Sequence, residues 1–196
     1  MWLKLTALPK HLLIALAVFA AACTPVLEKP VVVPAVLDPV IRPTIVEPAI
    51  PSAKSDQVIV PETVAPALAA LNKFRAANKL PRLDFDNRLA TAATGHAKAM
   101  AAGDFFSHVG ANGSNISKRV SEVGYPWRLV AENIAAGMQD GGEAVAVWID
   151  SPGHKRNMLT EGLTHAGIGY ARASPDPGKI AYEHYWVLVM GAPLKN

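Results

Sequence analysis

Proline is concentrated in one part of this chain of 196 residues. Nine of its sixteen prolines lie between residues 24 and 66. Each proline fixes φ and removes a backbone N–H donor, so neither a helix nor an inner strand can run through this stretch. The sequence therefore predicts an extended Pro-rich linker over residues 23–65, which at about 3.1 Å per residue could reach about 130 Å. Its apolar runs at 31–33 and 45–46 leave open that part of it packs on the domain or the membrane.

A single domain is predicted for the remaining residues, 66–196, which are enough to bury one core without disulfides. Before the linker, Lys4, Lys10 and His11 precede the uncharged run 12–22, which ends in small residues. This is the layout of a secretory signal peptide. As a helix the run would rise only about 16 Å, against a bilayer core of about 30 Å, so we expect a cleaved leader over 1–22 and not a membrane span.

Cys23 is the only cysteine, so no intramolecular disulfide can form. The segment Ala20-Ala21-Ala22-Cys23 resembles the lipobox of bacterial lipoproteins, although alanine replaces the usual leucine three places before the cysteine. The resemblance implies that Cys23 is lipid-modified, for example with palmitate, and anchors the chain in a membrane outside the cytoplasm. In a Gram-negative host, Thr24 would imply the outer membrane. The alternative is ordinary cleavage nearby, which would leave a free thiol.

The net charge of +3 is modest, and the basic residues form no block and no aromatic ladder. A nucleic-acid partner is therefore not expected.

Periodicity and turn signals predict helices followed by strands. The expected helices are one that ends near Leu80, one from a cap at Asp86 to Gly103, and three over 116–123, 143–149 and 154–159. Ser151 is expected to cap the last of them. The expected strands are 165–173 and 180–190, joined as an antiparallel hairpin across 174–178. This order favours an α+β domain.

Three residues far apart in the chain could form a chemical site. His108 follows a helix end and precedes a glycine-containing loop, where it could present a nitrogen to a pocket or be a part-exposed loop histidine. Glu132 lies in an apolar context, so it either points to solvent or is buried with a cationic, imidazole or metal partner. His154 opens a short helix, with Asn157 one turn further on, and its role could be structural or functional.

Two histidines and a glutamate match the ligands of a catalytic zinc site that leaves one position open for water. The helical HExxH spacing is absent, however, so their spacing alone does not bring them together. The other histidines are interpreted as packing residues: His96 as a hydrogen-bonded core residue, and His165 and His184 as strand residues.

Several ordered motifs resemble the CAP superfamily, the group of cysteine-rich secretory proteins, antigen 5 and pathogenesis-related 1 proteins, also called SCP domains. The motifs are His96-Ala97-Lys98-Ala99-Met100, Phe105-Phe106-Ser107-His108, Ala131-Glu132-Asn133-Ile134-Ala135, Trp148 with the run 151–159, His165-Ala166-Gly167-Ile168-Gly169-Tyr170, and Tyr185-Trp186. The resemblance implies an α-β-α sandwich with a central antiparallel sheet. It also implies a groove with two histidines and two acidic residues.

In that groove the resemblance places His108, Glu132 and His154, with Asn133, Ser151 and Asn157 beside them. The second acidic residue of the family falls on Ser151, while the adjacent Asp150 would point elsewhere on a helix. The loss of one carboxylate weakens the binding of a hard divalent cation more than it weakens the binding of zinc.

The resemblance leaves several functions open. We expect a non-enzymatic module that binds a lipid, peptide or cell-wall ligand. The alternatives are a hydrolase in which His108 and His154 hold zinc or another divalent cation, with Glu132 as third ligand or general base, and a structural envelope lipoprotein.

Overall fold

The centre of the domain is a five-stranded sheet with the strand order β1-β3-β5-β4-β2. The computed structural model describes residues 40–41, 61–173 and 182–195. Its strands are β1 Val40–Ile41, β2 Asp84–Phe85, β3 Trp127–Ala136, β4 His165–Arg172 and β5 His184–Pro193; its helices are α1 Ala65–Ala77, α2 Asn87–Gly103, α3 Ile116–Glu122, α4 Gly141–Asp150 and α5 Pro152–Met158.

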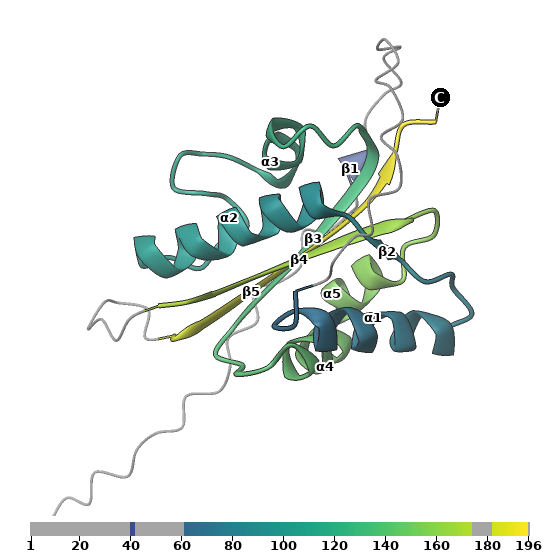
Figure 1. Cartoon of the computed structure of the whole chain (residues 1–196), viewed down its shortest axis with the longest axis horizontal. Coiled ribbons are helices and arrows are strands. Elements are labelled where there is room, and N and C mark those ends of the chain that lie inside the picture. The colour runs from purple at the N-terminus through teal and green to yellow at the C-terminus, as the bar shows by residue number, and fades with distance from the viewer. Residues whose placement is uncertain (1–39, 42–60, 174–181, 196) are drawn as a thin grey trace, which may run out of the picture.

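Helices cover both faces of this sheet, as Figure 1 shows, with α2 and α3 on one side and α1, α4 and α5 on the other. Along β5, alternate residues enter the two cores: Trp186, Leu188 and Met190 face α1, α4 and α5, whereas Val187 and Val189 face α2 and α3. The expected α-β-α sandwich is therefore confirmed.

Pairing in the sheet is antiparallel between β1 and β3, β3 and β5, and β4 and β5. Only the short edge strand β2 pairs parallel, with β4. The predicted β4–β5 hairpin is confirmed, although its turn over 174–178 lies outside the described residues.

The strand β3 was not among the elements that the sequence predicts. Every residue of it except Arg128 is buried, because helices cover both faces of the sheet. A strand buried on both faces reads as a nearly continuous apolar run, so the alternation of polar and apolar residues that marks a half-buried strand is missing.

Glycine brings α2 against the sheet. A Cβ at Gly167 or Gly169 of β4 would collide with the backbone of α2 at Ala90 and Thr94. The close approach holds the first half of α2 against the sheet.

The helices agree with the predicted ones, with small shifts at their ends. Asp86 caps α2 by accepting from the N–H groups of Arg88 and Leu89, as expected. Ser151 occupies the N-cap position of α5, but its side chain makes no capping hydrogen bond, so that prediction was wrong. The N–H of Lys155 instead donates to the backbone carbonyl of Ser151.

Part of the predicted linker packs on the domain. Val40 and Ile41 pair with Val130 and Leu129 at the outer edge of β3, which is the alternative that the apolar runs of the linker left open. No helix among the described residues is long and apolar enough to cross a bilayer. The predicted leader, Cys23 and most of the linker lie outside the described residues, so these domain limits stay predictions.

Candidate functional site

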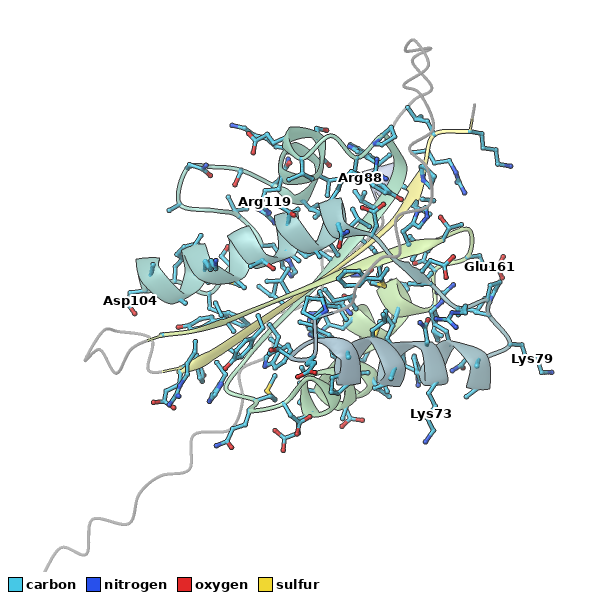
Figure 2. The ribbon with its side chains drawn as sticks, viewed as in Figure 1. Lys73, Lys79, Arg88, Asp104, Arg119 and Glu161 are labelled. Carbon is cyan, nitrogen blue, oxygen red and sulfur yellow. The ribbon has the colours of Figure 1, made fainter. Side chains whose placement is uncertain are left out.

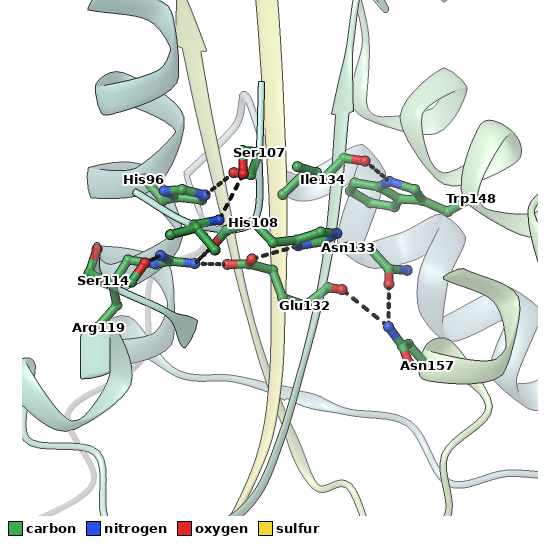
Figure 3. Close-up of polar contacts among 11 residues, drawn as sticks. His96, Ser107, His108, Ser114, Arg119, Glu132, Asn133, Ile134, Trp148 and Asn157 are labelled. Atoms are coloured by element: carbon green, nitrogen blue, oxygen red, sulfur yellow. Dashed lines mark hydrogen bonds and ion pairs between the residues drawn. The ribbon is translucent and has the colours of Figure 1, made fainter. Parts of the chain in front are cut away.

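The two central residues of the site, Glu132 and Asn133, point to opposite faces of β3, because successive side chains alternate along a strand. Glu132 contacts residues of the α2 and α3 layer, whereas Asn133 contacts α5 (Figure 3). The predicted groove residues therefore divide into two groups, one on each face.

Glu132 is completely buried and has two partners. Its Oε1 lies 2.9 Å from His108 Nδ1, and its Oε2 accepts from Arg119 Nη2 at 2.7 Å. Burial by itself raises the pKa of Glu132, but the hydrogen bond from His108 and the charge of Arg119 outweigh it and hold the pKa below its usual value. Glu132 is thus an ionised, paired carboxylate. The solvent-facing alternative was wrong, and the expected imidazole and cationic partners are both present.

Arg119 was missed by the sequence reasoning. Besides Glu132, its guanidinium donates to the carbonyl of Ser114 at 2.9 Å and to the carbonyl of His108 at 3.1 Å. Figure 2 shows Arg119 between α2 and α3. A signal was available, because Arg119 lies three residues after Ile116 and one before Val120, on the buried face of α3.

His108 lies in the loop after α2, with 13% of its side chain exposed. A carboxylate only accepts hydrogen bonds, so His108 Nδ1 carries the proton of the bond to Glu132. The preceding residue, Ser107, is anchored by its carbonyl, which lies 2.9 Å from His96 Nε2. His96 is buried and its pKa is lowered, chiefly by that burial, which confirms it as a hydrogen-bonded core residue.

On the other face, the side chains of two asparagines and a tryptophan form hydrogen bonds along the edge of β3. Asn157 Nδ2 donates to the carbonyl of Glu132 and to Asn133 Oδ1, both at 3.1 Å, and Asn133 Nδ2 donates to the carbonyl of His154 at 3.1 Å. The indole of Trp148 donates to the carbonyl of Ile134. Side chains therefore satisfy backbone groups that β1 is too short to reach.

The ring of His154 is fully buried, and neither of its nitrogens has a hydrogen-bond partner within the described part of the chain. Burial, followed by the charge of nearby His108, lowers the pKa of His154 to about 4. The ring is therefore neutral at pH 7. An unsatisfied buried polar group is rare and costs about 1–3 kcal/mol, so it calls for an explanation.

The metal site predicted from His108, Glu132 and His154 fits these positions only in part. No three His, Cys, Asp or Glu side chains of the described residues are grouped so that they could hold a metal ion. Both oxygens of Glu132 are engaged, which leaves two imidazoles as candidate ligands. The position of the second acidic residue holds the half-buried Ser151, and Asp150 is exposed. The three-residue metal site stays a prediction.

Two surface hollows lie beside α2. One of about 660 Å³ lies between α2, β4 and the start of α1, and one of about 440 Å³ lies between α2, α3 and the loop 110–114. Arg119 and His96 line the second, but His108, Glu132 and His154 line neither. The predicted ligand groove therefore does not coincide with either hollow.

A sheet between two helical layers, with a Glu-Asn pair on β3 that contacts His108 and the helix of His154, is the arrangement expected for a CAP domain. The model of the cysteine-rich secretory protein family matches residues 68–190, and the chain belongs to this family.

Its relatives are bacterial. The chain is 34% identical over 101 residues to the uncharacterized membrane protein YlbC of Bacillus subtilis, covering 52% of this chain and 29% of that protein. It is 28% identical over 102 residues to YkwD of the same organism, covering 52% of this chain and 40% of that protein. The chain thus matches well under half the length of either relative.

Solved structures agree on the fold. An extracellular protein with an SCP domain from Bacillus anthracis superimposes with a TM-score of 0.56 at 28% identity, covering 64% of this chain and 39% of that one. An outer surface protein of Borrelia burgdorferi gives 0.60 at 18% identity, covering 70% and 97%, and shows likeness of fold alone.

Proposed function

We propose that this protein is an extracytoplasmic lipoprotein, anchored in a membrane through Cys23, whose CAP domain is a non-enzymatic binding module. The leader-like run before Cys23 supports the anchor. Two similar proteins support the location, because their names describe an extracellular protein and a membrane protein. The ligand would be an amphiphile, a peptide or a cell-wall fragment.

The observation that carries the binding proposal is the ring of His154, which lies near His108 and whose nitrogens have no hydrogen-bond partner among the described residues. A neutral imidazole has one donor and one acceptor. A hydroxyl or amide group of a ligand both donates and accepts, so it would satisfy what the protein leaves unsatisfied. Glu132 contributes indirectly, because its two oxygens already bind His108 and Arg119.

Binding can be tested with three probes: soluble peptidoglycan fragments, phospholipid vesicles and an unstructured peptide library. We expect one class to bind saturably to the full chain, and His154→Gln to weaken that binding at least tenfold. The matched control is His184→Gln, because His184 is already paired with the hydroxyl of Tyr170 at 2.8 Å. Equal binding by wild type and His154→Gln, or binding of none of the three, would contradict the proposal.

Within the part of the chain that the structure describes, the nitrogens of His154 have no hydrogen-bond partner, and this also favours the zinc hydrolase. Zinc at one equivalent in the purified chain, lost together with hydrolytic activity in a His108→Ala and His154→Ala double variant, would support the hydrolase over the binding module. Its weak point is Glu132, which would have to leave a buried ion pair to serve as third ligand or general base.

A further inference from the structure

Arg119 and His108 are joined by a closed ring of contacts. Arg119 Nη2 donates both to Glu132 Oε2 at 2.7 Å and to the backbone carbonyl of His108 at 3.1 Å. The other oxygen of Glu132 lies 2.9 Å from the ring of that same histidine. One guanidinium therefore holds the backbone of His108 and the carboxylate that orients its ring (Figure 3).

The chemistry of the acceptor decides which nitrogen of His108 bears the proton. Ionised Glu132 can only accept, so the proton lies on Nδ1, and a neutral ring then has its lone pair on Nε2. Metal-binding and proton-transferring histidines are commonly oriented in this way by a carboxylate on the other nitrogen. The orientation depends on Glu132 staying ionised in a completely buried position.

Arginine suits this task better than lysine would. Its planar fork reaches Glu132, His108 and Ser114 simultaneously, with Nη1 donating to the carbonyl of Ser114 at 2.9 Å. A lysine ammonium is a compact charge at the end of a flexible chain, so it could pair with Glu132 without holding both carbonyls in place.

We propose that Arg119 is the positioning residue of this site, acting through Glu132 to fix the tautomer and the orientation of the His108 ring. The proposal adds Arg119 to the two histidines and the glutamate of the site. It also gives Glu132 a different role, which is to orient the His108 ring and not to contact the ligand. It rests on the proposed site, but it can be tested without any ligand.

A structural counter-ion role is the competing explanation, and Arg75 provides a matched control. Arg75, like Arg119, is a buried residue, and its guanidinium donates to the carbonyls of Pro81, Met158 and Thr160. It therefore resembles Arg119 in burial and in carbonyl contacts, but it has no carboxylate partner among the described residues. A variant at either arginine should cost stability, whereas only one should alter His108.

The experiment compares Arg119→Lys, Arg119→Met and Arg75→Lys in the full chain, using long-range ¹H–¹⁵N NMR spectra of the histidine rings at pH 7. In the wild type we expect the neutral form of the His108 ring to carry its proton on Nδ1 alone. Arg119→Lys should give mixed or exchanging signals for His108, and Arg119→Met should give a larger change if it folds. Arg75→Lys should leave the His108 signals as in the wild type.

Retention of the wild-type His108 pattern in Arg119→Lys would overturn the proposal. So would the same change of pattern in Arg119→Lys and Arg75→Lys, since that would report general loosening of the domain. Failure of all binding probes in the wild type would contradict the proposed binding function and leave the NMR result unaffected, so the two failures are distinguishable.

Discussion

The two histidines of the site come from different layers of the sandwich, His108 from the loop after α2 and His154 from α5, and they differ in burial and in hydrogen bonding. His108 is part-exposed, and its ring is bound to an ionised carboxylate. His154 is fully buried, and its ring binds nothing within the described residues. One imidazole is thus held by a carboxylate, whereas the other has no hydrogen-bond partner among the described residues. The family motifs contain both histidines but do not show that their rings differ in hydrogen bonding.

The largest expected effect comes from removing the charge on the His108 side. Glu132→Gln would leave Arg119 buried without its counter-charge, which typically costs about 3–5 kcal/mol. Chemical denaturation should detect a loss of that order. The control is Glu183→Gln, which breaks the exposed 3.5 Å ion pair with Arg172 and a 3.8 Å contact with His184 and should cost less than about 1 kcal/mol. Similar losses in the two variants would show that the Glu132 pair contributes no more than a surface pair.

The second expected effect is a pH dependence of the free energy of unfolding that comes from His154. The pKa of His154 is about 4 in the folded protein, whereas an unfolded histidine titrates near 6.5. Between pH 6.5 and 4 the unfolded state binds the extra proton, so the free energy of unfolding should fall as pH falls through this window, by up to about 3 kcal/mol.

His154→Leu should reduce that slope, as measured by denaturation at several pH values from 7 to 4.5; buried His96, whose pKa is also lowered, should account for part of the slope that remains. Glu132 does not interfere, because its folded pKa lies below the ordinary value of 4.5, and its contribution is lost only as pH falls through that lower range. The control is His184→Leu. An unchanged slope in His154→Leu would show that His154 is not the group responsible.

These differences show how far the sequence could predict the site. Residue chemistry alone predicted that a buried Glu132 needs an imidazole or cationic partner. The choice between burial and exposure was left open, because it depends on β3, whose burial on both faces hides the strand pattern. Arg119 was missed because its partners are 13 and 11 residues away and are brought together only by tertiary packing. The lack of a hydrogen-bond partner for the His154 ring among the described residues has no sequence signature at all.

A smaller effect should come from Asn157, which links the two sides by donating to the carbonyl of Glu132 and to Asn133 Oδ1. Asn157→Leu would leave these two buried acceptors without that donor, at a cost of about 1–3 kcal/mol in the free energy of unfolding. Asn157→Asp is the matched variant, because its carboxylate cannot donate either. A loss in Asn157→Leu and none in Asn157→Asp would indicate that packing, and not hydrogen bonding, gives Asn157 its role.

The smallest expected effect comes from giving His154 a carboxylate neighbour, as His108 already has. Ser151→Asp would place a carboxylate where the family has its second acidic residue, one helical turn before His154 and at the N-cap of α5. A negative charge there favours the protonated imidazole of His154, so its pKa should rise above about 4, and the charge should stabilise the helix by about 0.3–1 kcal/mol. Ser151→Asn is the neutral control, which could cap the helix without adding charge. An NMR titration of His154 measures this pKa. A pKa that stays near 4 in Ser151→Asp would mean that the side chain at this position does not face the ring. The missing second carboxylate would then not explain why the ring of His154 has no partner among the described residues.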